Sequence, residues 1–218
     1  MKCYCYEKDN KFVWCVENAP QDDFNSRGFE KVGDKYFREY PLKEFHWAED
    51  KRIIAKNFAR LGASYFLCKG DWKIAMATFA QKCKANNLKW YTTGSISEAL
   101  MGVDIKPGDI DIIAHTSDFF KMREIFSAYT IEPFVDNKGN WILRYFARLC
   151  IDGCQIEIAA DESRNEENHL YEPITWQSYD LKVEPLKERY AIEVQRNRQD
   201  RVDAIKKYMQ QNGLSEKY

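Results

Sequence analysis

Two short motifs in the middle of the 218-residue chain carry residue types that could do chemistry together. The first is Gly94-Ser95, which follows a short strand-like run and precedes a helical pattern. A glycine there lets the backbone approach a phosphate closely, and the free N–H groups at a helix start attract anions. The second is Asp109-Ile110-Asp111, whose two carboxylates project from the same face of a predicted strand. The two motifs predict a phosphate site beside a divalent-metal site.

Two adjacent aspartates repel each other unless a cation neutralises them, so a bound cation is expected, and a third carboxylate on a neighbouring strand would complete its site. Mg²⁺ (or Mn²⁺) is the natural candidate, since it takes hard oxygen ligands and commonly combines carboxylates with substrate phosphates. The alternative is an exposed edge strand with two solvated aspartates. Glu157 alternates with isoleucines and is our candidate for the third ligand and for the group that orients or deprotonates an attacking hydroxyl. Asp152 competes with it but lies in an Asp-Gly turn, where aspartate is expected for conformational reasons.

The elements that must position these residues alternate between strand and helix. The pattern predicts a strand over 88–92, a short helix over 95–103 and a second strand over 109–114. Asp71 and Ser117 are suited to cap two further helices. Strands are expected at 141–149 and 155–159, an extended run around 174–176, and helices near 185–194 and 200–211. Residues 1–40 alternate apolar and polar positions as in a small β-meander, and a helix follows Asp50.

Composition limits the classes of protein that fit. The chain has 33 Lys+Arg against 34 Asp+Glu, so it lacks a global basic field for nucleic acid, which is disfavoured as a partner. The hydrophobic content of 44% is enough for a globular core. The seven cysteines are odd in number and lack paired C-x-x-C spacing, and no signal peptide or long apolar run is visible. We therefore expect a cytoplasmic protein without membrane association.

The motifs resemble those of the nucleotidyltransferase superfamily that includes DNA polymerase beta and the small antibiotic-modifying adenylyltransferases. In that family a hydrophobic-Gly-Ser motif is followed, after a spacer, by Asp-hydrophobic-Asp-hydrophobic and by a third acid on a later strand. Thr93-Gly94-Ser95, Asp109-Ile110-Asp111-Ile112 and Glu157 would meet this pattern. Thr93 is less apolar than usual, and Glu157 stands where Asp is commoner. The resemblance covers residues 70–160, with a looser match at 196–201.

The resemblance implies an α+β fold, in which a nucleotidyltransferase-like mixed sheet is flanked by helices and carries a small N-terminal β-meander and C-terminal helices. Three parts are expected: residues 1–45 form the β-meander appendage, residues 46–165 form the core, and residues 166–218 form an extended segment and helices packed on the core.

The implied activity is transfer of a nucleoside monophosphate from a nucleoside triphosphate, with ATP as first choice, to a hydroxyl of a small acceptor, releasing pyrophosphate. Asp109, Asp111 and Glu157 would hold the metal and act in catalysis. The expected triphosphate contacts are Gly94, Ser95, Lys106 and Arg198. Two alternatives stay open: a transferase that adenylylates a protein partner, as some antitoxins do, and a degenerate member that binds nucleotide or a partner without turnover.

Overall fold

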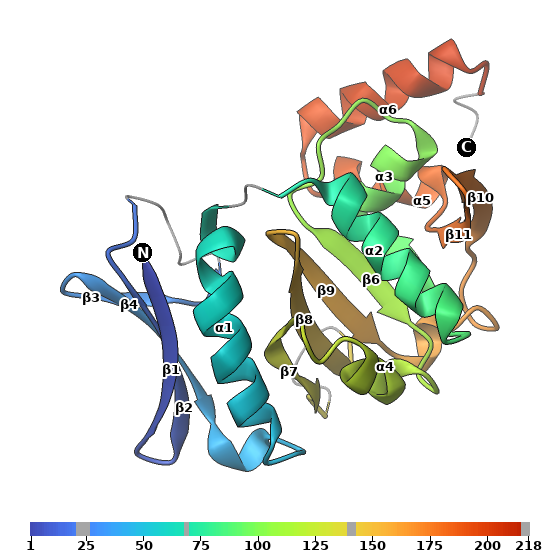
Figure 1. The fold of residues 1–218 in the computed structure, drawn as a ribbon. Helices are drawn as coiled ribbons and strands as arrows, with labels where there is room; N and C mark the ends of the chain where they lie inside the picture. The colour runs from blue at the N-terminus through green and yellow to red at the C-terminus, as the bar shows by residue number, and fades with distance from the viewer. Residues whose placement is uncertain (21–26, 68–69, 139–142, 215–218) are drawn as a thin grey trace.

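The computed structural model describes residues 1–20, 27–67, 70–138 and 143–214, and in these ranges the chain forms two sheets (Figure 1). The N-terminal sheet is antiparallel, with the order β1-β2-β4-β3. Its strands are β1 (Lys2–Lys8), β2 (Lys11–Glu17), β3 (Glu30–Val32) and β4 (Lys35–Pro41). A 3₁₀ turn (Leu42–Glu44) and the long helix α1 (Asp50–Leu67) lead from this sheet to the rest of the chain.

The second, main sheet has seven strands in the order β10-β11-β5-β6-β9-β8-β7 within the described residues. In chain order these are β5 (Trp90–Thr93), β6 (Ile110–Ala114), β7 (Thr130–Asp136), β8 (Tyr145–Ile151), β9 (Cys154–Ala160), β10 (Glu172–Trp176) and β11 (Tyr179–Val183). β6 runs parallel to β9 and β11 parallel to β5, while the other neighbours are antiparallel. The sheet is therefore mixed.

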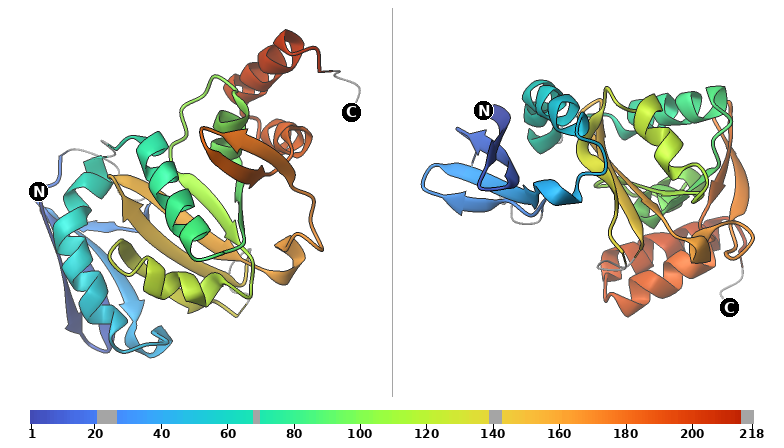
Figure 2. Two further views of the ribbon diagram at one scale, coloured as in Figure 1. Left: turned by 45° about the vertical axis from the view of Figure 1, so that its right-hand side comes forward. Right: turned by 90° about the horizontal axis from the view of Figure 1, so that it is seen from below.

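Helices cover both faces of the main sheet (Figure 2). They are α2 (Trp72–Ala85), α3 (Gly94–Met101), α4 (Phe119–Ile125), α5 (Leu186–Gln195) and α6 (Gln199–Gln211), with a 3₁₀ turn at Glu162–Arg164. α2 and α4 lie on one side of the sheet, and α5 and α6 lie on the other. The predicted α+β class, with a helix-flanked mixed sheet, an N-terminal meander and C-terminal helices, is confirmed. No helix in the described ranges is both long and apolar enough to span a bilayer.

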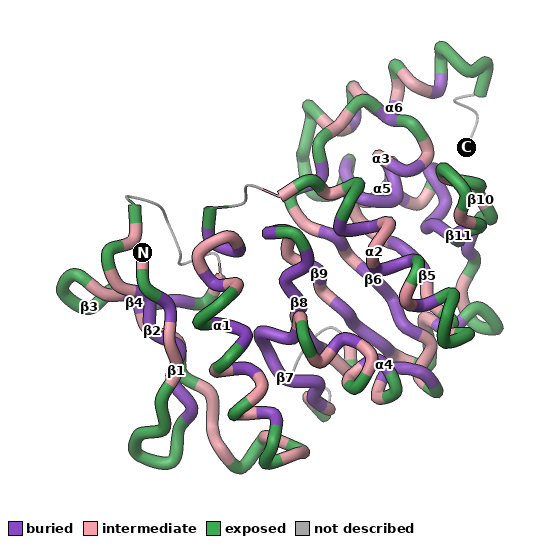
Figure 3. The backbone as a smooth tube through the Cα atoms, viewed as in Figure 1, coloured by how far each residue is buried: buried purple, intermediate pink, exposed green. Residues whose placement is uncertain are grey.

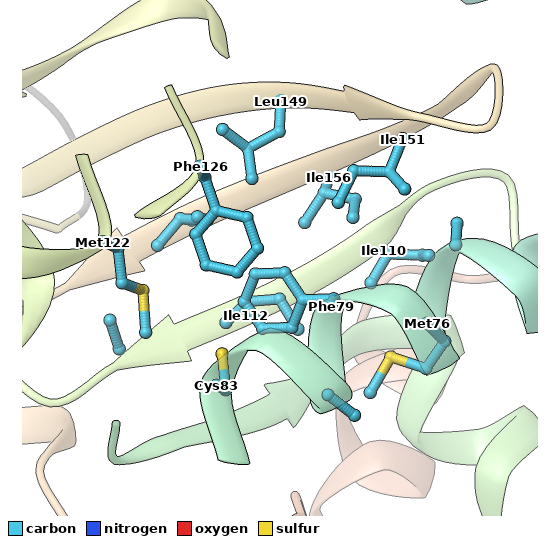
Figure 4. Close-up of a cluster of buried hydrophobic side chains, with 14 of the residues drawn as sticks. Met76, Phe79, Cys83, Ile110, Ile112, Met122, Phe126, Leu149, Ile151 and Ile156 are labelled. Carbon is cyan, nitrogen blue, oxygen red and sulfur yellow. The ribbon is translucent and has the colours of Figure 1, made fainter. Parts of the chain in front are cut away.

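The main core lies between α2, α4 and the sheet (Figures 3 and 4). Phe79 of α2 stacks on Phe126, with ring centroids 4.7 Å apart. Ile110 and Ile112 of β6 are buried in this core, so the strand presents the intervening Asp111 to the opposite face. This alternation fixes the direction in which the acidic side chain projects.

A second apolar cluster joins the N-terminal sheet to α1 and to the edge of the main sheet. Trp14 of β2 and Phe58 of α1 belong to it, as do Ile131 of β7 and Cys150 of β8. The Trp14 indole Nε1 also donates a hydrogen bond to the carbonyl oxygen of Ile131 at 3.0 Å. Continuous apolar packing therefore joins the N-terminal sheet, α1 and the edge of the main sheet.

Candidate active site

One row of residues crosses the main sheet on the face away from α2. Strand pairing aligns Thr93 with Asp111, Asp111 with Glu157, Glu157 with Arg148, and Arg148 with Glu132. Residues that face each other across paired strands project from the same side, so these five side chains form a continuous polar row. The row places Asp111 and Glu157, both predicted from the sequence, on adjacent strands.

The turn before α3 lies directly against this row. Gly94 has a φ of +65°, and a Cβ added there would lie 2.1 Å from Oδ2 of Asp111. Glycine is therefore required both by the backbone and by the approach of the carboxylate. Ser95 is buried in the first turn of α3, and Asp109 immediately precedes β6. The helix start and the acids are thus immediate neighbours.

A cavity of about 680 Å³ opens over the row. Six of the predicted site residues line it: Gly94, Ser95, Asp109, Asp111, Glu157 and Arg198. The seventh, Lys106, is exposed and lines a smaller neighbouring cavity of about 280 Å³, which shares Gly108 and Asp109 with the first. The structure thus brings six predicted residues together and places Lys106 beside them.

Electrostatics at the acidic wall favour a bound cation. Burial, together with the charges of Asp109 and Glu157, raises the pKa of Asp111 to about 7. Arg189 and Arg196 act in the opposite direction but do not cancel the effect. Burial also raises the pKa of Glu157, although Arg148 opposes the shift. The wall therefore holds more carboxylate than its surroundings neutralise, and its donors are all hard oxygen atoms of the kind that Mg²⁺ prefers.

Glu157 has partners that the sequence analysis did not identify. Its Oε1 accepts hydrogen bonds from Nε of Arg148 at 2.7 Å and from Nε2 of Gln155 at 2.8 Å, and Nη2 of Arg148 lies 2.7 Å from the same oxygen. Asp152, the alternative third acid, lies in the β8–β9 turn with a φ of +48°, and its Oδ2 accepts the backbone N–H of Asp71. It does not line the cavity.

Arginines form the opposite wall of the cavity and rest on a buried network of charges. Arg196, Arg198 and Arg201 line the cavity together with Arg189. Arg189 is 3% exposed and contacts three buried carboxylates, those of Glu98 at 3.1 Å, Glu184 at 3.2 Å and Glu193. This network was also missed, because its members come from α3, α5 and the segment between β11 and α5.

Glu184 connects the network to the turn at Gly94. The hydroxyl of Thr93 donates a hydrogen bond to Oε2 of Glu184, and Arg164 donates one to Oε1 at 2.7 Å. Burial acts to raise the pKa of Glu184, but these hydrogen bonds and the charge of Arg189 outweigh it, so the pKa lies below its usual value. Thr93, which precedes Gly94, is thus held in place by the ionised carboxylate of Glu184, and both oxygens of that carboxylate accept hydrogen bonds.

A separate trio of residues also brings possible metal ligands close together. Among the described residues, His169, Glu184 and Glu188 are the one trio whose possible ligand atoms all lie within 4.8 Å of one another. Glu184 is already paired with Arg164 and Arg189, and these positive charges disfavour a second cation. Asp109, Asp111 and Glu157 do not meet the same spacing, so their side chains would have to turn towards one another to share an ion.

Comparisons with known proteins give the following similarities. No family model and no curated protein sequence matches the chain. A protein from Thermotoga maritima, provisionally described as a nucleotidyltransferase, is similar over 62% of this chain and 91% of its own, with 20% identity and a TM-score of 0.49. An antigenic nucleotidyltransferase-like protein from Paracoccidioides brasiliensis is similar over 62% of this chain and 76% of its own, with 15% identity and a TM-score of 0.41.

A third similar structure is that of ANT(2")-Ia in complex with adenylyl-2"-tobramycin. It covers 66% of this chain and 93% of its own, with 7% identity and a TM-score of 0.45. Because all three TM-scores lie below 0.5, the chemistry of the cavity has to be inferred from its own side chains.

Proposed function

We propose that this protein transfers a nucleoside monophosphate from a nucleoside triphosphate, with ATP as first choice, to a hydroxyl of a small acceptor. One observation supports this function: three features line the same cavity. They are the start of α3 at Gly94, the acids Asp111 and Glu157 in register on adjacent strands, and a group of arginines on the opposite wall. We also propose a cytoplasmic location, which the six free cysteines of the described residues support, because thiols persist in reducing compartments.

Asp109, Asp111 and Glu157 would hold Mg²⁺ or Mn²⁺. The raised pKa of Asp111 supports this assignment, since burial and the neighbouring carboxylates of Asp109 and Glu157 disfavour its negative charge, which a divalent cation would neutralise. When bound, such a cation lowers the pKa of an acceptor hydroxyl and neutralises charge on the triphosphate. Arg148 and Arg189 cannot supply that positive charge in full, because each is shared with other buried carboxylates.

The triphosphate would be held by the helix start and by the arginine wall. Backbone N–H groups of the first turn of α3, together with the Ser95 hydroxyl, are suited to phosphate oxygens. Arg198 and Arg201 have only weak partners, at 3.5 Å from Glu193 and Glu98 respectively. Nη1 of Arg201 is buried and makes no hydrogen bond within the described residues, so it has a donor available for a phosphate oxygen.

In the proposed reaction the acceptor oxygen forms a bond to the α-phosphorus. The bond from that phosphorus to the bridging oxygen breaks, and pyrophosphate leaves with the electron pair. Glu157, as part of the cation site, would orient the acceptor hydroxyl, whose proton passes to solvent as the new bond forms. Positioning and charge neutralisation by the two walls would supply most of the rate, as in other phosphoryl-type transfers.

Ligand binding and turnover test the proposal separately. A nucleoside triphosphate with Mg²⁺ or Mn²⁺ at about 100 times its Kd should stabilise the protein by about 2.7 kcal/mol, measured by thermal or urea unfolding. Transfer of labelled nucleotide to a library of hydroxyl compounds, followed by mass spectrometry, should be lost in Asp109→Asn and Asp111→Asn. Asp104→Asn is the matched control, because Asp104 is an exposed acid on the preceding loop and does not line the cavity.

Other results of these two assays would favour a different function. Nucleotide-dependent stabilisation without transfer to any acceptor would favour a binding module. Label that appears on a protein partner would favour the protein-adenylylating alternative. Equal transfer by Asp111→Asn and Asp104→Asn would contradict the metal assignment.

A further inference from the structure

The N-terminal sheet reaches the candidate site through a line of alternating charges. Arg38 of β4 donates Nη1 to Oε1 of Glu132 on β7, and Nη1 of Arg148 on β8 donates to the same oxygen at 2.7 Å. Arg148 then donates Nε to Oε1 of Glu157 at 2.7 Å. The four side chains are between 9% and 23% exposed, so solvent screens them little. The line links the edge of the N-terminal sheet to the cavity.

A second line begins on α1 and ends on the same atom. The hydroxyl of Tyr65 donates to Oε1 of Gln155 at 2.6 Å, and Nε2 of Gln155 donates to Oε1 of Glu157 at 2.8 Å. Tyr65 is 2% exposed and belongs to the apolar cluster shared by α1 and the N-terminal sheet. Both lines therefore originate within residues 1–67.

The two lines of hydrogen bonds leave one carboxylate oxygen of Glu157 without a hydrogen-bond donor among the described residues. Every hydrogen bond to this carboxylate from the described residues falls on Oε1. Arg148 cannot move away without also leaving the buried Glu132 with only one cationic partner, which would be costly. Because Glu157 lines the cavity, the restraint on Oε1 leaves Oε2 as the oxygen that can serve a ligand.

We propose that the N-terminal sheet and α1 form a positioning scaffold for Glu157, in which Arg38 acts through Glu132 and Arg148, and Tyr65 acts through Gln155, to present Oε2 to a divalent cation. This inference rests on the proposed role of Glu157 as a cation ligand. Arg38 and Tyr65 touch neither substrate nor cation and are positioning residues. Groups that orient metal ligands typically change metal affinity by about 10–100-fold when they are removed, so more remote members of the lines should have smaller effects.

The test measures Mn²⁺ affinity by electron paramagnetic resonance, without relying on turnover. Arg38→Gln and Tyr65→Phe should each weaken Mn²⁺ binding by roughly 2- to 30-fold, the range expected for residues that act through a network. The double variant should bind Mn²⁺ more weakly than either single variant. Nucleotide binding in EDTA, which depends on the arginine wall, should stay unchanged in all three variants.

Lys35→Gln is the matched control, since Lys35 lies on the same strand as Arg38 but pairs with Glu17 within the N-terminal sheet. Thermal unfolding checks that each variant is folded at the assay temperature. Tyr65→Phe removes one hydroxyl only, so it tests the second line even if Arg38→Gln does not fold.

The outcomes separate this inference from the proposed function. If wild type does not bind Mn²⁺, or if Glu157→Gln binds it as tightly as wild type, the assignment of Glu157 as a ligand is wrong. If Glu157→Gln loses affinity while Arg38→Gln and Tyr65→Phe match Lys35→Gln, the scaffold is refuted and the cation site stands.

Discussion

Replacing Gly94 with alanine would test whether the turn before α3 and the acids act as one unit. The new Cβ would lie 2.1 Å from Oδ2 of Asp111, so the carboxylate would have to retreat by about 1 Å, a displacement that can lower catalysis about 100-fold. The backbone contributes a second effect, because the φ of +65° costs a non-glycine residue about 1–2 kcal/mol. We expect Gly94→Ala to lose about 1–2 kcal/mol of unfolding free energy and about 100-fold in transfer rate.

Gly33 offers a control that separates the two effects. It has the same φ of +65°, but a Cβ added there would meet no atom within 4 Å. Gly33→Ala should therefore show the backbone strain alone, with a similar loss of unfolding free energy and no change in transfer or in Mn²⁺ binding. The comparison needs urea unfolding of both variants, Mn²⁺ titration, and the transfer assay with whichever acceptor is found.

The reasoning would be refuted if Gly94→Ala kept the Mn²⁺ affinity and transfer rate of Gly33→Ala. That result would mean that the Asp111 carboxylate can move away from Gly94 without any effect on Mn²⁺ binding or transfer, so the contact between the two residues would have no role in function. A loss of stability in Gly94→Ala far beyond that of Gly33→Ala, with transfer retained in the folded fraction, would have the same meaning.

Two further predictions concern the buried charges. In EDTA the native state should keep a proton on Asp111 up to about pH 7, whereas the unfolded chain loses it at about pH 4. The contribution of Asp111 to the unfolding free energy should therefore fall as pH rises through this window and level off above it. Asp111→Asn should remove this contribution, and a pH dependence identical to that of wild type would argue against the raised pKa. Arg189→Met should cost about 3–5 kcal/mol in urea unfolding, because three buried carboxylates lose their shared partner. Lys11→Met, which breaks an exposed pair, should leave stability nearly unchanged, and equal effects of the two substitutions would contradict the assigned network.

Local signals account for the parts of the fold that the sequence predicted. Asp71 caps α2 as expected, since its Oδ1 accepts the backbone N–H of Lys73 at 2.8 Å. Strand β7 was not predicted, because Glu132 and Pro133 interrupt its apolar pattern. Glu132 can be buried there only because Arg38 and Arg148 arrive from two other strands. The prediction of β7 required knowledge of these tertiary contacts, which the residues adjacent in the sequence do not provide.

The site was partly predictable for a similar reason. Glu157 could be selected because it alternates with buried isoleucines. Its partner Arg148 was missed, although the two-residue Asp152-Gly153 turn fixes a hairpin register in which Arg148 faces Glu157. The pairing of Arg189 with Glu98 has no comparable signal, since 91 residues separate them in the chain.

The ion pairs that the charged residues already form determine which ligands the cavity can bind. Arg148 and Arg189 are fully engaged by buried carboxylates, so neither can neutralise Asp111 without releasing another acid. Among the described residues, Asp109 and Asp111 therefore have no ion-pair partner on one wall, while Arg198 and Arg201 on the other wall have only weak partners at 3.5 Å. A ligand that carries only positive or only negative charge would be attracted to only one of the two walls. A cation bound to a polyphosphate carries both signs in one compact unit, and this match of charges supports the metal–nucleotide complex proposed as the ligand.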